Sequence, residues 1–404
     1  MKMKILNLMF LISLVILCTS CQRNTEPIET DIPSPGFQED ISWPSLADSP
    51  WPMSRHDPQS TGRSKEIGPE AGIIEWSIEP YWLETGVSMG LESTILFAYN
   101  SLFAYSTNGT AKWELRLNDF TNSTPIITAD GTIYTTAGKK LIAISTERTI
   151  KWEYEVDGNI GWMINIGKDG IVYIIDISST LYAISSSGNL IWQFTDSRFT
   201  RNNFSGISFS PDGSTLYIPG SVSSVLAVDV QNQTTKWEFG QIRMYNSPIV
   251  DSDGNLYLLP NYNETGTERT QFYSINKNGE IRWVFYFKYE FSLFHSNTPT
   301  IDKNGNIYFA TDTLYSLDYS GELNWKVGLE GFSDCPLVCD NNCNVYVGTM
   351  FDGGFIAIYC YDSDGNLNWI IKDDTQQQVG GSPALGVNSL YFPTWKSTKI
   401  YSIR

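Results

Sequence analysis

The chain has 404 residues, of which 27 are Lys or Arg and 44 are Asp or Glu, so its formal net charge is −17. A nucleic-acid-binding protein needs a cationic surface to displace counterions from phosphates, and this charge balance excludes that class. Aromatic residues make up 14% of the chain, which excludes a disordered protein and is typical of a β-rich globular one.

The N-terminus has the pattern of an export signal. Two lysines precede an apolar run from Ile5 to Leu17, which is too short for a comfortable membrane span, although a permanent transmembrane anchor is the alternative. The ending Leu-Cys-Thr-Ser-Cys resembles a bacterial lipobox, and this resemblance implies diacylation of Cys21. We expect residues 1–20 to be a lipoprotein signal peptide. The mature protein would then be exported and anchored to a bacterial membrane, either on the periplasmic face of the outer membrane or on the cell surface.

The next segment, residues 21–50, is acidic, contains several prolines and lacks apolar periodicity. Chains of this composition are extended and poorly able to form a core. We predict that it is a tether between the anchor and a folded body.

A repeat of about 42 residues follows the tether. Tryptophans recur at spacings of 37 to 46 residues, and most of them end a Gly-x-x-x-Trp motif, with Arg148 and Gln233 replacing the Gly in two units. The eight are Trp76, Trp113, Trp152, Trp192, Trp237, Trp283, Trp325 and Trp369. This period suits four short strands or two helices per unit.

The turn residues decide between strands and helices. Asp-Gly or Asn-Gly separates apolar runs in units such as SPIVDSDGNLYLLP from Ser247, which is the pattern of a β-hairpin. Third strands such as Leu181–Ile184 are apolar on both faces, as in a sheet packed between two others. The sequence therefore predicts an all-β, eight-bladed β-propeller over residues 51–404, with four-stranded antiparallel blades.

The last unit lacks its Trp strand, whereas residues 72–76 carry one before the first complete unit. We expect residues 72–76 to complete the last blade and close the ring, which removes free sheet edges. An open solenoid is the alternative, but it would need polar capping units.

The units LFAYSTNGTAKW from Leu102 and LYAISSSGNLIW from Leu181, with the opening WPMSRHDPQSTGRS from Trp51, resemble the PQQ-binding-like β-propeller repeat. That resemblance implies that the repeated Trp packs between adjacent blades. In size, anchor, repeat and blade count the chain is similar to BamB-type lipoproteins of outer-membrane barrel assembly. This implies a monomeric, non-enzymatic scaffold that binds envelope proteins, a barrel-assembly complex among them.

Quinoprotein dehydrogenases of the same superfamily hold PQQ and calcium on the axis and often carry a Cys-Cys disulfide. This chain has no adjacent Cys-Cys pair, and its repeats have lost most of the Asp-Thr part of those enzymes' signature. It has two histidines, His56 and His295, and no nucleophile elbow or zinc motif. We expect no catalytic residue, cofactor or metal. The second hypothesis, after the scaffold, is a protein that binds a glycan or another small ligand, and the third is a PQQ-dependent enzyme.

Two further sets of residues have structural explanations. The Asp-Ser-Asp-Gly strings at Asp251 and Asp362 lack the spaced oxygen donors of a calcium loop, and we interpret them as turns. One blade holds four cysteines, which in an exported protein indicate disulfides or buried free thiols, with a metal site as the alternative: Cys335, Cys339, Cys343 and Cys360.

Recognition is expected on the connections from each Trp strand to the next Ser/Thr-Pro strand, because these loops gather on one face of the ring. They carry aromatic, cationic and amide side chains of the kinds that are common in binding sites. The candidates are Trp82, Trp162, Arg201, Asn202, Arg243 and His295.

Overall fold

The computed structural model describes residues 35–80, 85–121, 123–161, 164–199, 206–220, 224–240, 244, 246–260, 270–288, 297–351, 355–374, 378–395 and 399–404. The predicted signal peptide, Cys21 and the first part of the tether lie outside these residues. Residues 35–404 form one compact unit. The described part of the chain is built of strands and turns, and it contains no helix long and apolar enough to cross a membrane.

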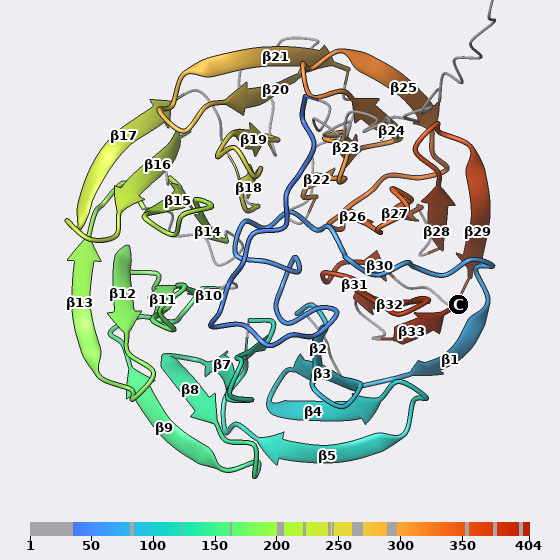
Figure 1. Ribbon diagram of the computed structural model, residues 1–404. Helices are drawn as coiled ribbons and strands as arrows, with labels where there is room; N and C mark the ends of the chain where they lie inside the picture. Colours follow the sequence, from blue (N-terminus) through green and yellow to red (C-terminus); the bar gives the residue numbers. More distant parts are fainter. Residues whose placement is uncertain are drawn as a thin grey trace, which may run out of the picture. The chain divides into compact units, whose positions relative to one another are not determined.

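Eight antiparallel sheets are arranged around a central axis (Figure 1). The innermost strands are β2 (Ser88–Gly90), β6 (Ile126–Ile127), β10 (Asn165–Ile166), β14 (Ser208–Phe209), β18 (Ile249–Val250), β22 (Thr300–Ile301), β26 (Val338–Cys339) and β31 (Ala384–Gly386). The second strands are β3 (Thr94–Ala98), β7 (Ile133–Ala137), β11 (Val172–Ile175), β15 (Thr215–Pro219), β19 (Leu256–Leu258), β23 (Ile307–Ala310), β27 (Val345–Met350) and β32 (Ser389–Trp395).

The outer half of each blade holds the longer strands. The third strands are β4 (Ser101–Ser106), β8 (Lys140–Ile144), β12 (Thr180–Ile184), β16 (Ser224–Asp229), β20 (Thr270–Ile275), β24 (Thr313–Leu317), β28 (Ile356–Tyr361) and β33 (Ile400–Ile403). The outer strands are β5 (Ala111–Arg116), β9 (Ile150–Glu155), β13 (Leu190–Thr195), β17 (Thr234–Gly240), β21 (Ile281–Phe287), β25 (Leu323–Gly328), β29 (Leu367–Asp373) and β1 (Ile74–Ile78). A short strand, β30 (Gln378–Val379), pairs with β32. The predicted eight-bladed propeller with four-stranded blades is confirmed.

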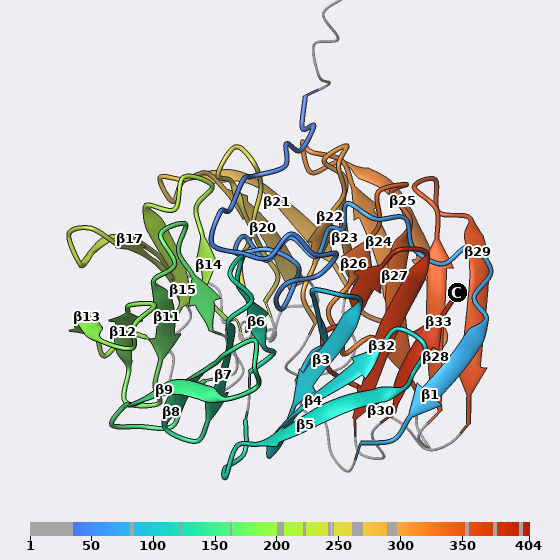
Figure 2. The same cartoon turned by 60° about the horizontal axis from the view of Figure 1, so that its bottom comes forward.

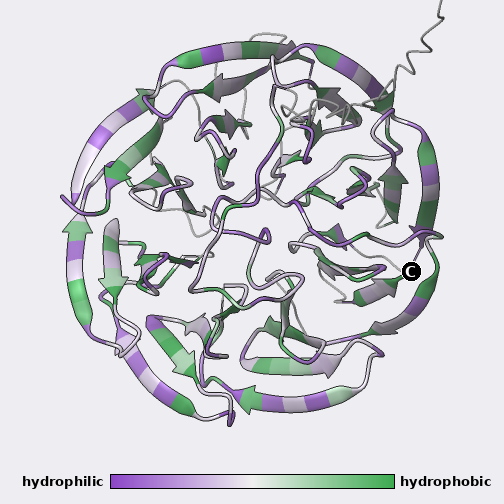
Figure 3. Ribbon diagram, in the orientation of Figure 1, coloured by the Kyte–Doolittle hydropathy of each residue, from purple (hydrophilic) through white to green (hydrophobic). Residues whose placement is uncertain are grey.

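The turn chemistry explains why these segments fold as hairpins. Gly131, Gly254 and Gly305 in the first turns of three blades have φ of 81–85°, a region that glycine adopts without steric cost. Most residues of the second and third strands are buried, whereas outer strands alternate exposed and half-buried residues. Figure 3 shows the same alternation of hydrophilic and hydrophobic residues along the rim. The core therefore lies between neighbouring blades.

The ring closes as predicted. Strand β1 pairs antiparallel with β33, with Ser77 opposite Tyr401 and Ile78 opposite Ile400. Residues just before the first complete blade thus supply the outer strand of the last one. No free third strand remains at this seam.

The repeat tryptophans pack between adjacent blades, as the resemblance implied. In six blades the indole nitrogen donates a hydrogen bond to a carbonyl in the next blade's outer turn, where a glycine makes room for the ring. The pairs are Trp76–Thr107 at 3.0 Å, Trp152–Ser186 at 3.0 Å, Trp237–Lys277 at 2.9 Å, Trp283–Tyr319 at 3.2 Å, Trp325–Ser363 at 2.7 Å and Trp369–Pro69 at 3.1 Å. Where Arg148 replaces the glycine, its guanidinium lies 5.6 Å from the ring of Trp113. Trp192 packs against a core cluster that the second, third and fourth blades share.

Residues 35–50 differ from the extended tether predicted for residues 21–50. Trp43 is buried, and its indole nitrogen donates to the carbonyl of Ile166 at 2.8 Å. The amide of Ala47 donates to Ile127 at 3.0 Å. Burial of Trp43 stabilises this segment on the ring, so residues 35–50 are part of the folded body.

Candidate functional site

Residues 51–63, here called the axial segment, lie across the centre of the ring. Figure 2 places the segment on one face of the ring, above the innermost strands. Seven of the eight blades each donate at least one hydrogen bond to its carbonyls, six of them from a backbone amide and one from a side chain. The segment is therefore tied to almost the whole ring. The bonds run from Met89 to Trp51, Ile127 to Pro52, the side chain of Asn165 to Pro58, Phe209 to Pro58, Val250 to Gln59, Ile301 to Thr61 and Cys339 to Gly62, at 2.7–3.4 Å.

The axial segment is tightly curled. Arg55, His56 and Ser60 have positive φ of 61°, 74° and 57°, which is uncommon for residues with a side chain. Gly62 has φ of 67°, and a Cβ there would lie 2.4 Å from Nη2 of Arg55. The curl and the glycine together let the Arg55 side chain fold back into the axis.

Arg55 is fully buried at the axis. Its guanidinium donates to the carbonyls of Pro299 and Leu337, which precede the innermost strands of two adjacent blades. Burial disfavours the charged form and lowers the pKa of Arg55 to about 10, despite the nearby Asp57. Arg55 therefore remains charged near neutral pH and holds two blades together.

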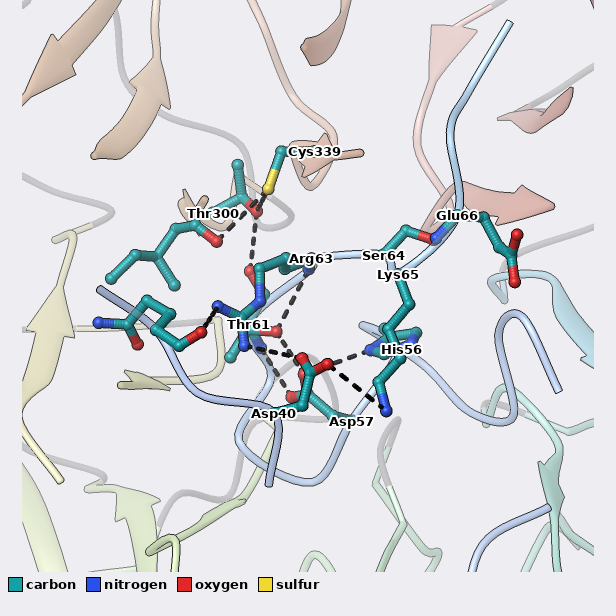
Figure 4. Close-up of polar contacts among 12 residues, drawn as sticks. Asp40, His56, Asp57, Thr61, Arg63, Ser64, Lys65, Glu66, Thr300 and Cys339 are labelled. Atoms are coloured by element: carbon teal, nitrogen blue, oxygen red, sulfur yellow. Dashed lines mark hydrogen bonds and ion pairs between the residues drawn. The ribbon is translucent and has the colours of Figure 1, made fainter. Parts of the chain in front are cut away.

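His56 and Asp57 directly follow Arg55 in the axial segment, and Figure 4 shows them beside Thr61. Nδ1 of His56 lies 3.4 Å from Oδ2 of Asp57, and Thr61 donates its amide to Oδ1 at 3.0 Å and its hydroxyl to Oδ2. Burial opposes ionisation of Asp57, but the hydrogen bonds from His56 and Thr61 outweigh it, and the pKa of Asp57 is lowered. These contacts hold the curl of the axial segment.

A pocket of about 340 Å³ opens between residues 38–49 and the axial segment. Asp40 reaches across it and lies 3.5 Å from Arg63 and 3.8 Å from Lys65 (Figure 4). Trp43 and His56 also line the pocket. No Ser or Cys hydroxyl or thiol among the described residues hydrogen-bonds to His56, so the pair His56–Asp57 lacks a nucleophile in these residues.

The described axis does not fit a quinone cofactor with calcium. The cation of Arg55 is bonded to main-chain carbonyls rather than free for a ligand. The described ranges also hold no group of three His, Cys, Asp or Glu side chains placed to bind a metal. The chain's own axial segment fills one face of the centre instead.

The four cysteines are free thiols and are buried. Free thiols and disulfides were the alternatives that the sequence left for these four residues, and an alkylation experiment decides between them. Burial raises the pKa of Cys335, Cys343 and Cys360 to about 12, and it raises the pKa of Cys339 as well. Cys343 occupies the glycine position of a turn, with φ of 62°.

The Asp-rich strings form turns. Oδ1 of Asp251 accepts the amides of Asp253 and Asn255 at 3.0 and 2.7 Å, and Oδ2 accepts from Tyr257 at 2.9 Å. Asp362 makes the same backbone contacts in its turn. The carboxylates thus serve their own backbone, as predicted.

The structure places none of the six predicted recognition residues. Trp82, Trp162, Arg201, Asn202, Arg243 and His295 all lie outside the described residues. The axial segment is the feature that sequence reasoning missed. Its signal was a polar run with two prolines and Gly62 that lacks strand alternation, directly before the first repeat.

A family model described as outer membrane protein assembly factor BamB matches residues 61–284, more than half of the chain. The chain belongs to the BamB family. No curated protein sequence matches it.

Solved structures share the fold. BamB from Moraxella catarrhalis has a TM-score of 0.62 at 16% identity, covering 83% of this chain and 100% of that one. Quinohemoprotein alcohol dehydrogenase from Comamonas testosteroni has a TM-score of 0.65 at 11% identity, covering 90% and 81%. A europium-containing methanol dehydrogenase has a TM-score of 0.61 at 14% identity, covering 86% and 90%. The BamB fold is thus shared with enzymes, and the fold alone does not assign an activity.

Proposed function

We propose that this protein is a lipid-anchored, non-enzymatic scaffold that binds other proteins at the bacterial cell envelope. The observation that carries the proposal is the filled axis, because Arg55 and its neighbours bind the ring itself and leave no described constellation for catalysis. Membership of the BamB family supports a role in the assembly of outer-membrane proteins. The N-terminal signal pattern and Cys21 support anchoring by lipid.

The anchor is tested in cells with Cys21→Ala. We expect the variant to leave the membrane fraction and to lose palmitate labelling, while Cys18→Ala, the matched control, retains both. Palmitate on the Cys21→Ala variant would refute the site.

The scaffold role is tested by cross-linking in cells, gentle solubilisation and mass spectrometry of the wild-type complex. We expect an envelope complex, a barrel-assembly protein among its members, to be enriched over a cross-linked control strain that lacks the protein. Recovery of the protein alone at full membrane abundance would contradict the scaffold role.

Binding of a small polar ligand is the second candidate function, and the pocket of about 340 Å³ beside His56 favours it. A glycan or other polar molecule would meet Asp40, Arg63 and Lys65 there. Thermal shift with a glycan panel tests this function. A ligand that stabilises the wild type and a Lys65→Met variant equally would place binding elsewhere.

A further inference from the structure

One outer strand differs from the others at two positions that follow its repeat Trp. The first and third residues after the repeat Trp are Val284 and Tyr286 in β21. The other seven outer strands have at least one charged or polar side chain there. Their pairs are Ser77 and Glu79, Glu114 and Arg116, Glu153 and Glu155, Gln193 and Thr195, Glu238 and Gly240, Lys326 and Gly328, and Ile370 and Lys372.

Among the described strands, none covers the outer edge of β21. The strand pairs with β20 along one side, from Ile281 opposite Ile275 to Phe287 opposite Thr270. It is the last strand of its sheet on the rim of the ring (Figure 1), and no strand of the described ranges pairs with its other side. Such an edge presents a row of main-chain donors and acceptors.

The side chains at this edge favour contact rather than repulsion. Tyr286 is 53% exposed, and Val284 packs partly against the core between the fourth and fifth blades. The aromatic rings of Phe285 and Phe287 face the sixth blade instead, where they contact Phe309. Proteins commonly protect edge strands with charged side chains. Neither β13 nor β21 has a charge at these two positions, but β13 has the polar Gln193 and Thr195 there, whereas β21 has Val284 and Tyr286.

We propose that β21 binds an extended segment of another envelope protein, which joins the fifth blade as an added strand. The occupant must be an extended strand, because only that conformation matches a row of alternating donors and acceptors. Its length is set by the 7 residues of β21, and its side chains opposite Val284 and Tyr286 are apolar. This inference rests on the proposed scaffold function.

Charge excludes a second copy of this chain as the favoured occupant. Each copy has a net charge of −17, so two copies repel each other. A neutral or basic segment with alternating apolar residues therefore fits best.

The probe is a fluorescein-labelled, capped peptide of sequence KTVTYTVTK, titrated into the full-length protein and followed by polarisation. We expect one peptide per chain, with slower amide hydrogen exchange in residues 281–287. The double variant Val284→Glu with Tyr286→Glu, which copies the pair of β9, should weaken binding by about tenfold or more. As the matched control, Glu153→Val with Glu155→Tyr should create a second site on β9.

Unchanged affinity in the double variant, exchange protection outside β21, or no binding of the peptide would overturn the proposal. Tyr286→Glu alone guards against misfolding, because its side chain is exposed and its melting curve should match the wild type. A concentration-dependent dimer that Tyr286→Glu abolishes would identify a second copy as the occupant and would also overturn it. If the double variant fails to bind peptide but keeps its cross-linked envelope complex, the scaffold stands and the complex uses another surface.

Discussion

Trp369 joins the last complete blade to the segment that closes the ring. Its side chain is 8% exposed, its indole nitrogen donates to Pro69 at 3.1 Å, and a Cβ on Gly72 would lie 2.6 Å from its Cδ2. Truncation of a buried Trp to Ala costs about 3–5 kcal/mol. A protein of this kind has a total stability of about 5–15 kcal/mol, so Trp369→Ala should remove a large part of it.

Urea unfolding and differential scanning calorimetry measure this cost. For a ring of this size a loss of 4 kcal/mol lowers Tm by about 5 °C. Trp369→Phe keeps an aromatic ring but loses the hydrogen bond, which should cost about 1 kcal/mol, and the smaller ring adds a packing cost to this. Gly72→Ala disturbs the same contact from the other side, so the double variant should cost less than the two single variants combined. Additive effects, or a loss below about 1 kcal/mol for Trp369→Ala, would refute this account of the seam.

Gly321→Ala should destabilise the protein by about 1–2 kcal/mol or more in the same urea titration, because φ is 87° and the new Cβ would lie 2.5 Å from Trp283. Gly328→Ala is the control and should be neutral, because the space around Gly328 is open. Asp57 contributes stability above its ordinary pKa, and this is lost as the pH falls below 3.8 through its lowered native pKa, so acid unfolding curves of wild type and Asp57→Asn should converge there. The four cysteines should resist alkylation in the native protein and react in denaturant without reductant; two thiols or fewer would show that disulfides form.

The repeat architecture could be predicted because each blade signals itself locally. The turn glycines mark positions with positive φ. The Trp that follows each of these glycines at a fixed spacing needs a neighbouring blade against which its ring can pack. Even the exceptions keep the geometry: Arg148 and Gln233 adopt φ of 65° and 55° at the glycine position. Closure by residues 72–76 followed from counting strands, since the last unit lacked what the first segment carried.

The axial segment could not be predicted because its partners are distributed over the whole ring. Its contacts join residues separated by up to 282 positions, as between Arg55 and Leu337, and no local periodicity reports them. The same reason explains residues 35–50. In the sequence Trp43 is an isolated aromatic residue in a polar segment, and its hydrogen-bond partner, the carbonyl of Ile166, lies more than a hundred residues away.

The ring is closed at two radii, and this limits how it can respond to a partner. At the rim, β1 pairs with β33, and at the centre the axial segment binds seven blades. Spreading the blades apart would break both sets of bonds and expose Arg55, whose charge is costly to leave unpaired in the core. A partner that joins a rim strand such as β21 breaks none of them, because it adds bonds to an edge that is already formed. We therefore expect partner binding to leave the ring intact and to change only strands and loops at its periphery.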